Sequence, residues 1–587
     1  MVLKPRMITK VKEDITATGI KDPVAQPLID RLLALGRDLL KPDKNGILRS
    51  PEEILEIMQT EVDNARNIGF MNPLLDMEGL GVDIHLDTPT KILHTILLGV
   101  VKYFWAQSVF VLEKDKKLNI LESRLASVNT SGLDIPSLNA AYICQYRGSL
   151  IGRHFKAIVQ VIPFVVYDLF PGNTQLINAW LLLGRITAML WYTEIDEIDV
   201  YTDELRDLIH NFLLVTASCS PSIIVLKPKF HFLVHLPAYI RRFGPALLFS
   251  TERFESFNGV FRAASTFSNR QAPSRDIARR FANIERTKHV CSGGFWKEEG
   301  RWVCASPAVV SYPTKSTVFA KLLGIPNLKK APQDTVITRA TAIPLLWLGL
   351  AQNIGASHLE APGGPDDYYV PSVSLVSQLG DTVKVGSDIL LRDQSFGHVR
   401  SIFVHRLAND TAVHYVLIQR YKLSEQKHPL FDMPVVFRLA TMIYVPVVEV
   451  ECLVNLQHDC ATTQKCKCTK VCYETQERKE TSKALLRVNH SDNMRYIINI
   501  HALHNALRVR RAISPELYNC RAQTLNKETI ITTAVEKMKT NKAMKDRITA
   551  AKKAAKTIID EAIANPEETV GADTVPGTPA QSKKRKH

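Results

Sequence analysis

Cysteine and histidine side chains are concentrated in one short segment. It reads QHDCATTQKCKCTKVC and contains His458, Cys460, Cys466, Cys468 and Cys472. Thiolates and imidazoles at short loop spacing are ligands that suit Zn²⁺, although no Cys-x₂-Cys pair is present. Two interpretations are therefore open. The cysteines are free thiols in a lysine-rich loop, or three of them form a tetrahedral structural zinc site with His458 or a later histidine such as His501 or His504.

Acidic residues lie at a predicted helix start within Leu226–His289. Ser250 or Thr251 can cap this helix, which places Glu252 and Glu255 in its first turns. The apolar residues that follow at helical spacing are Phe254, Phe257, Phe261 and Ala264. This spacing predicts an apolar stripe that docks on a core.

A basic helix is predicted to begin at Ser274, with Ile277, Phe281 and Ile284 buried. Its basic residues are expected to face outward: Arg275, Arg279, Arg280 and Arg286. Guanidinium groups on one helix face can contact phosphates without reading bases. We therefore expect this face to bind DNA.

These two predicted helices and the segment before them resemble the C-terminal half of a known transposase family. It is the DDE transposase of fungal CACTA-type elements and the related Kyakuja, Dileera and Zisupton group. The match falls on His235-Leu236-Pro237, Gly244-Pro245 and Thr251-Glu252-Arg253, and extends at lower density from about Thr18 to about Leu517. The resemblance implies a partial ribonuclease-H-like core with a helical insertion. It also implies that Glu252 is the third metal-binding carboxylate.

The segment Gly81–Trp105 resembles the part of this family that carries the second carboxylate. It supplies His85, Asp87, Thr88 and Pro89 of the family pattern but has Lys91 where an acid is usual. If the family's metal ligand is the acid at the position of Lys91, the ammonium group of Lys91 repels the cation. If the ligand is Asp87, the metal site survives. Asp83 is a poorer candidate for this ligand. A further interpretation is that the family acid only completes a helix cap. Thr88 is predicted to cap a helix that has Pro89 at its first position.

A DDE transposase binds two divalent cations, Mg²⁺ or Mn²⁺, between three carboxylates. The first 80 residues predict helices over Leu28–Leu40 and Pro51–Val62, the second with a Ser50/Glu53 capping box, and no three-stranded meander for the first aspartate. We therefore expect a transposase-derived nuclear DNA-binding protein without autonomous strand-transfer activity. The alternatives are an active transposase subunit with a missing N-terminal part, and a non-enzymatic chromatin-interaction protein.

The amino-acid composition is that of a folded protein, and its positive net charge favours a polyanionic partner. The 587 residues are 45% hydrophobic and 23% charged, with net charge +15 and pI near 9.2, which favours a polyanion such as DNA. No uninterrupted apolar run reaches the roughly 18 residues of a membrane span, so no membrane partner is expected. The chain has ten cysteines, four of them scattered singly before position 305, which suits a reducing compartment.

The predicted architecture is α+β and multidomain. A helical transposase-like region (1–305) precedes a Pro-rich linker (306–371), a small β-barrel that resembles a bromo-adjacent homology domain (372–456) and a Cys/His-containing segment (457–520). A basic amphipathic helix (521–565) and a flexible tail (566–587) follow. The tail ends in Lys583, Lys584, Arg585 and Lys586, a pattern typical of nuclear import. Self-association is also open.

The periodicity of the chain predicts the elements inside these regions. Helices are expected over Leu150–Tyr167, Leu176–Tyr192, Leu205–Ala217 and Asn526–Ala564. Strands are expected over Asp388–Arg392, His398–His405, Val413–Tyr421, Val435–Phe437 and Met442–Val445, with a hairpin turn at Asn409-Asp410.

Overall fold

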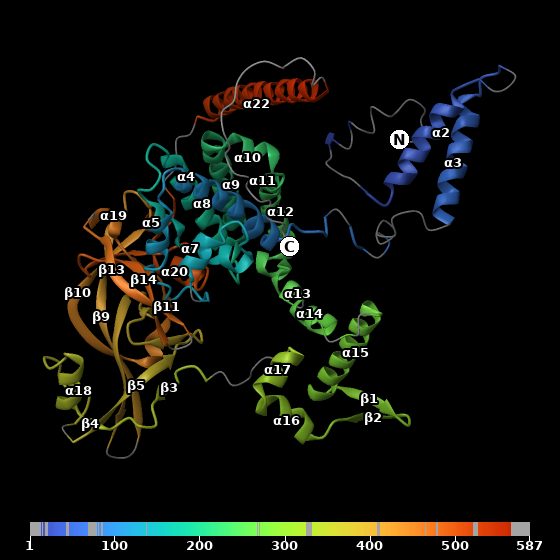
Figure 1. Ribbon diagram of the computed structural model, residues 1–587. Helices are drawn as coiled ribbons and strands as arrows, with labels where there is room; N and C mark the ends of the chain where they lie inside the picture. The colour runs from blue at the N-terminus through green and yellow to red at the C-terminus, as the bar shows by residue number, and fades with distance from the viewer. Residues whose placement is uncertain are drawn as a thin grey trace, which may run out of the picture. The chain divides into compact units, whose positions relative to one another are not determined.

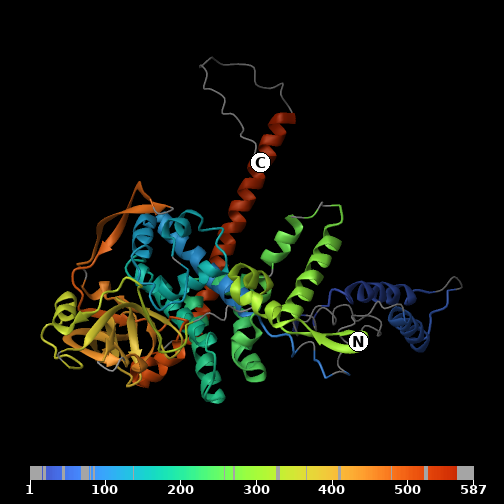
Figure 2. The same cartoon turned by 90° about the horizontal axis from the view of Figure 1, so that it is seen from below.

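The chain divides into two compact units, Met1–Thr90 and Lys91–His587, which are drawn in Figure 1 and, turned by 90°, in Figure 2. The computed structural model describes residues 13, 16–17, 22–42, 46–67, 79, 81–83, 86–136, 138–256, 258–266, 268, 271–324, 331–364, 366–407, 411–463, 465–476, 479–520 and 526–564. The import-like residues Lys583–Lys586 and the predicted turn at Asn409-Asp410 lie outside these ranges.

The first unit contains a helix pair, α2 (Gln26–Leu39) and α3 (Pro51–Asn67). Leu32 of α2 and Met58 of α3 are buried in the small core between them. The predicted capping box is confirmed. The Glu53 N–H donates to Ser50 Oγ (3.2 Å), and the Ser50 N–H donates to Glu53 Oε2 (2.9 Å).

The predicted helix cap at Thr88 is wrong. Residues 88–91 are not helical, and the next helix begins at Ile92. Thr88 and Pro89 fit a helix start locally, but the chain stays non-helical through Lys91, so the helix begins beyond the reach of the Thr88 side chain. A turn just before Thr88 is closed instead by Asp83 and Asp87: the Asp83 N–H donates to Asp87 Oδ2 (2.8 Å), and the Asp87 N–H donates to the Asp83 carbonyl (2.7 Å).

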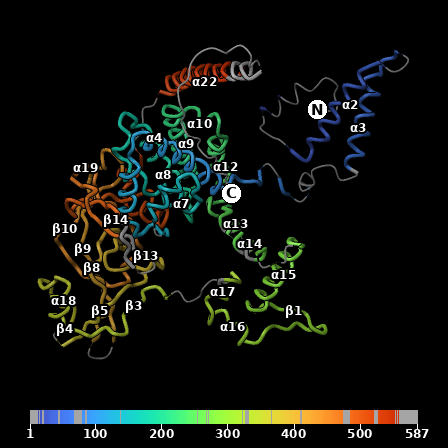
Figure 3. Tube along the Cα trace, viewed as in Figure 1, coloured from blue at the N-terminus to red at the C-terminus, as the bar shows by residue number. Residues whose placement is uncertain are grey.

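The second unit begins with a helical core, visible as a tube in Figure 3. Its elements are η2 (Leu93–Val101), α4 (Lys102–Lys114), α5 (Leu118–Leu125), α6 (Ala140–Gln145), α7 (Gly152–Val166), α8 (Thr174–Leu190), α9 (Ile198–Cys219), α10 (Pro221–Leu226), α11 (Lys229–Phe232), η3 (Leu233–His235) and α12 (Leu236–Phe243). The helices α7, α8 and α9 confirm the predicted helices in this region. Their apolar residues follow helical spacing, which is why the sequence could predict them.

Large aromatic side chains fill the centre of this core. Phe104 packs edge-on against Trp180 with ring centroids 5.8 Å apart, and Trp180 Nε1 donates to the buried hydroxyl of Ser108 (2.9 Å). The segment Leu93–Lys114 is long and apolar enough to cross a membrane by length and composition, but 61% of its most apolar window is buried inside the protein. Burial in this core accounts for its composition.

The C-terminal part of the second unit is an antiparallel sheet that curls into a half-barrel, so the α+β class is confirmed. Its described strands are β3 (Val336–Thr338), β4 (Leu345–Leu346), β5 (Tyr368–Val376), β6 (Thr382–Lys384), β7 (Asp388–Leu391), β8 (Phe396–Arg406), β9 (Ala412–Lys427), β10 (Pro434–Pro446), β11 (Val450–Val454), β12 (Leu456–His458) and β15 (Arg495–Ile498). The two short strands predicted within β10 are one strand, with an irregularity between Arg438 and Met442.

The strand order explains the curl. The main path runs β11-β7-β8-β9-β10-β15-β12, and its two outer strands are consecutive in sequence, separated only by Asn455. The sheet also uses β12 and β15, which lie beyond the predicted barrel range of 372–456.

The predicted linker, 306–371, is more structured than its proline content indicated. It contains α16 (Pro307–Lys315), α17 (Thr317–Leu323), β3, β4 and α18 (Trp347–Ile354). Trp347 packs edge-on against Tyr369 of β5 and Phe403 of β8. The proline-interrupted apolar segments before β5 therefore contribute to the sheet and its cover.

The chain ends, among described residues, in the long helix α22 (Lys527–Ala564). It contacts α9 and α10. The helix has nine Lys and Arg against five acidic residues. Apolar side chains predicted to form an amphipathic face are exposed on it, including Met544 and Ile548.

An ion pair between the half-buried His504 and the buried Asp381 links the sheet to the segment after β15. His504 Nε2 lies 2.6 Å from Asp381 Oδ1, while Asn505 Nδ2 and the Leu453 N–H donate to Asp381 Oδ2. The hydrogen bond to Asp381 raises the pKa of His504, although burial opposes it, and Asp134 acts in the same direction as Asp381. Burial raises the pKa of Asp381, but the hydrogen bonds from His504 and Leu453 outweigh it, and the net shift is downward.

This pair predicts a loss of stability on the alkaline side. A raised histidine pKa gives stability that is complete below the unfolded value of about 6.5 and is lost as pH rises through the folded value. The lowered pKa of Asp381 removes its contribution only in acid. The unfolding temperature of the wild type should therefore exceed that of His504→Gln at about pH 5.5, and the difference should shrink towards about pH 9. A difference independent of pH would contradict this assignment.

Candidate metal centre

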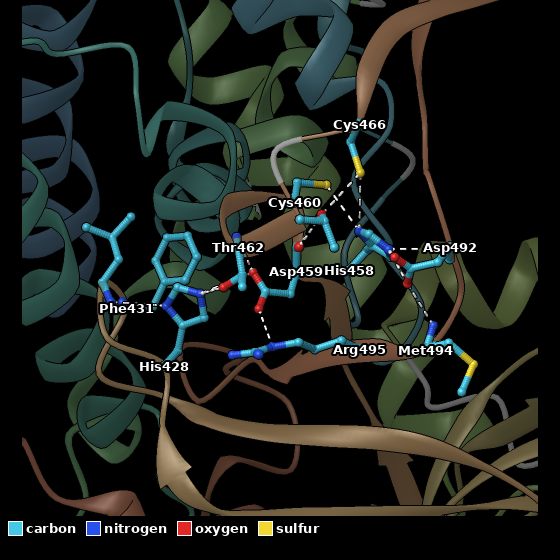
Figure 4. A network of polar contacts seen from close by, with 12 residues as sticks. His428, Phe431, His458, Asp459, Cys460, Thr462, Cys466, Asp492, Met494 and Arg495 are labelled. Atoms are coloured by element: carbon cyan, nitrogen blue, oxygen red, sulfur yellow. Dashed lines mark hydrogen bonds and ion pairs between the residues drawn. The ribbon is translucent and has the colours of Figure 1, made fainter.

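Four potential metal ligands meet at the base of a two-stranded ribbon. The ribbon consists of β13 (Lys467–Gln476) and β14 (Lys479–Asn489), which pair antiparallel. Before it come β12 and the short helix α19 (Cys460–Thr463), and after it comes β15. The ligand atoms of His458, Cys460, Cys466 and His490 all lie within 4.8 Å of one another. Figure 4 shows three of them, His458, Cys460 and Cys466. We call these four residues the His/Cys group.

The separations within the His/Cys group fit a tetrahedral ion. Cys460 Sγ lies 3.3 Å from His458 Nδ1 and 3.5 Å from His490 Nδ1. Cys466 Sγ lies 3.8 Å from His458 Nδ1. A tetrahedral zinc with Zn–S of about 2.3 Å and Zn–N of about 2.0 Å has ligand-to-ligand edges of about 3.3–3.8 Å. A cation could therefore sit between these four atoms without a change of backbone.

Outer hydrogen bonds orient the ligands. His458 Nε2 lies 2.9 Å from the carbonyl oxygen of Asp492, which leaves Nδ1 turned towards the two sulfur atoms. The hydroxyl of Thr463 is 3.6 Å and that of Ser491 3.8 Å from Cys466 Sγ. Metal-bound histidines in proteins usually donate their second ring N–H to a carbonyl or carboxylate. The arrangement around His458 is of that kind.

The helix start that carries Cys460 is held by a buried carboxylate. Asp459 is fully buried. Its Oδ1 lies 3.1 Å from His428 Nε2, and its Oδ2 forms an ion pair with Arg495 Nε (2.6 Å), as Figure 4 shows. Burial alone would raise the pKa of Asp459, but the hydrogen bonds from His428 and the Thr462 N–H lower it to about 2. Asp459 is thus ionised and fixes α19 on β15.

The ligands differ in how readily they lose a proton. Burial, followed by the neighbouring His458, lowers the pKa of His490 to about 4, so its imidazole is neutral near pH 7. Burial, followed by the proximity of Cys466, raises the pKa of the Cys460 thiol well above its ordinary value. A bound cation would reverse the second effect, because a coordinating thiol is deprotonated.

A family model matches this part of the chain. A domain of unknown function (DUF8590) matches residues 327–518. No curated protein and no solved structure matches the chain. The matched range begins in the predicted linker and contains the whole curled sheet and the His/Cys group, which indicates that sheet and group belong to one unit.

The structure brings together only part of the predicted cysteine site. His458, Cys460 and Cys466 are in the His/Cys group, whereas Cys468 and Cys472 lie in β13 and are not members. Sequence reasoning missed His490, which directly follows β14 at the base of the ribbon. The two later histidines considered as ligands lie elsewhere: His504 pairs with Asp381, and the ring of His501 packs against Gly184 of α8.

The predicted catalytic carboxylates lie in different units, Asp87 in the first and Glu252 in the second. Asp87 closes a turn with Asp83, and Glu252 Oε2 lies 3.9 Å from the ammonium group of Lys156. In the residue ranges that the structure describes, Glu252 is not part of any group of three or more His, Cys, Asp or Glu ligands. A cation beside Glu252 opposes the binding of Mg²⁺ or Mn²⁺, which carboxylate oxygens favour.

The described parts of the helix predicted after Thr251 are α13 (Glu252–Ser256) and α14 (Asn258–Thr266). Phe257, also predicted to face the core, lies outside the described residues. Phe254 was expected to dock on a core but is 76% exposed, and Phe261 is also exposed, whereas Ala264 is buried. The prediction of a buried apolar stripe is therefore wrong at Phe254 and Phe261.

The predicted arginine helix is α15 (Pro273–Cys291). Its apolar residues are half-buried rather than buried, and Phe281 stacks on Phe261 with ring centroids 4.2 Å apart. The arginine face is exposed and consists of Arg275, Arg279, Arg280 and Arg286. The structure thus places these guanidinium groups on one helix with solvent access.

Proposed function

We propose that the chain is a transposase-derived nuclear DNA-binding protein that holds a structural zinc ion and does not itself cut or join DNA. The arginine face of α15 carries the DNA-binding part of this proposal, since its guanidinium groups are exposed while the apolar side of the helix is packed. The net charge of +15 supports a polyanionic partner.

Zinc is the ion that best suits the His/Cys group. Two sulfur and two imidazole ligands are a typical structural zinc set. A catalytic zinc site keeps one position open for water or substrate, whereas the His/Cys group supplies four protein ligands. We therefore assign the ion a role in holding the ribbon base and none in a reaction.

The surroundings of Glu252 support the absence of strand transfer. Two-metal catalysis needs several carboxylates around the cations, and Glu252 faces Lys156 instead. Metal-dependent nicking of duplex DNA by the purified protein with Mn²⁺, abolished by Glu252→Gln, would overturn this part of the proposal.

Neutralising the arginine face should weaken DNA binding and its dependence on salt. Each lost phosphate contact reduces the slope of log affinity against log salt by about 0.9. We expect a variant with Arg275, Arg279 and Arg280 changed to Gln to show a flatter slope than the wild type on unrelated duplexes. Fluorescence anisotropy at several salt concentrations measures both slopes.

A matched control removes the same charge elsewhere. Lys102, Lys114 and Arg206 are exposed residues of the helical core, and their change to Gln lowers the net charge equally. This control should keep the slope of the wild type. Equal slopes for all three proteins would exclude α15 as the phosphate-binding face.

A further inference from the structure

A cavity of about 220 Å³ lies between the helical core and the curled sheet. Asn178 and Arg185 of α8 and Asn211 of α9 line one side. Phe431, in the turn between β9 and β10, and His501 line the other. This cavity is separate from the His/Cys group and from the arginine face, so the proposed function makes no use of it.

Arg185 lines this cavity, and its guanidinium group has no hydrogen-bond partner among the residues that the structure describes. The residue is 1% exposed, and its Nε, Nη1 and Nη2 atoms all lack a hydrogen bond. Its Cζ lies 3.8 Å from the centre of the Tyr518 ring. Stacking on an aromatic ring covers one face of the guanidinium but leaves its N–H donors unsatisfied.

The nearby negative charge is already committed. Glu204 Oε1 is 3.8 Å from Arg185 Nη2, beyond hydrogen-bond range, while Glu204 Oε2 lies 2.6 Å from Arg510 Nη2. Two buried or half-buried guanidinium groups therefore share one carboxylate. The one acid that lines the cavity, Asp432, forms an ion pair with Lys427 (3.2 Å). A buried charge without a partner is costly. Among the described residues no carboxylate lies within hydrogen-bond distance of Arg185, so an anion bound beside it would be stabilising.

We propose that this cavity binds a small carboxylate with a short apolar chain, whose carboxylate pairs with Arg185. A guanidinium fork matches a carboxylate in bidentate geometry. Leu181, Leu430 and Phe431 supply apolar walls for the chain. A cavity of about 220 Å³ has room for a short-chain acid.

Equilibrium dialysis of the full-length protein with radiolabelled butyrate tests this site. At constant ionic strength we expect saturable binding of one butyrate per chain. Arg185→Gln should weaken it by roughly tenfold or more, because a charge-assisted bidentate pair is lost. Arg206→Gln, an exposed arginine of α9, should bind as the wild type does.

A second variant keeps the test decisive if Arg185→Gln does not fold. Asn178→Phe retains the guanidinium but places a ring in the cavity, so it should also lose butyrate. Absence of saturable binding by the wild type, or unchanged binding by both variants, overturns the site. Displacement of butyrate by an equal concentration of phosphate or chloride overturns the carboxylate assignment, because the apolar walls would then contribute nothing.

Discussion

Changing Cys466 to Ser should release a zinc ion that the wild-type protein carries at about one per chain. The His/Cys group joins His458 of β12 and Cys460 of α19 with Cys466 and His490, which immediately flank the ribbon, so the ion would link both ends of the ribbon to the sheet. Zinc in small structural sites contributes roughly 10–16 kcal/mol of apparent binding energy. Here the sheet forms part of the site independently, so we expect a smaller loss of several kcal/mol, concentrated in the ribbon. Elemental analysis gives the zinc content, and hydrogen exchange locates the destabilised segment.

The chain offers its own control for this experiment. Cys472 lies in β13, opposite Leu485, and is not in the His/Cys group. Cys472→Ser should therefore keep the zinc and the exchange protection of the wild type. Wild-type protein that is purified without chelator and contains no zinc would contradict the assignment, as would full zinc content in Cys466→Ser.

Truncating Asn455 should be among the most destabilising single substitutions in the sheet. Its side chain is buried between β11 and β12, where Nδ2 donates to the carbonyls of Asn129 (2.8 Å) and Ser131 (2.7 Å). Its Oδ1 accepts from Gln457 Nε2 (2.7 Å) and Asn499 Nδ2 (2.8 Å). Each buried group left without a partner costs about 1–3 kcal/mol, so Asn455→Ala should cost roughly 3–5 kcal/mol. Urea unfolding followed by circular dichroism measures the change.

Asn541→Ala serves as the comparison, because Asn541 is exposed on α22. Its effect should stay within about 0.5 kcal/mol. The loop that contains Asn129 and Ser131 also approaches the sheet closely at Gly132. A Cβ at Gly132 would lie 2.8 Å from the Val454 carbonyl, at a backbone φ of +78°. If Asn455→Ala unfolded at the same urea concentration as Asn541→Ala, the contact between this loop and the sheet would not be a stabilising one.

Local patterns in the sequence were sufficient for several elements of this fold. The helices α7, α8 and α9 and the capping box at Ser50 depend on residues within a few positions of one another. The cap at Thr88 failed because a Thr-Pro pair fits both a helix start and a non-helical segment, and the local pattern does not say where the helix begins.

The His/Cys group shows what local patterns miss. Cysteine density pointed to Cys468 and Cys472, yet the fourth member of the group is His490, which returns to Cys460 because β13 pairs with β14. Strand register brings distant residues together and is not encoded in spacing. The same holds for Arg185, which stacks on Tyr518, a residue far away from it in the sequence.

The ribbon of β13 and β14 leaves the sheet and returns to it between β12 and β15, and two ligands, Cys466 and His490, immediately flank it. The zinc ion proposed for this base would fix both ends of the ribbon, whatever lies between them. The ribbon is therefore a place where the chain can gain or lose residues without disturbing the register of the sheet. Homologous chains should differ most in length there, and a foreign hairpin or epitope should be accepted at its tip.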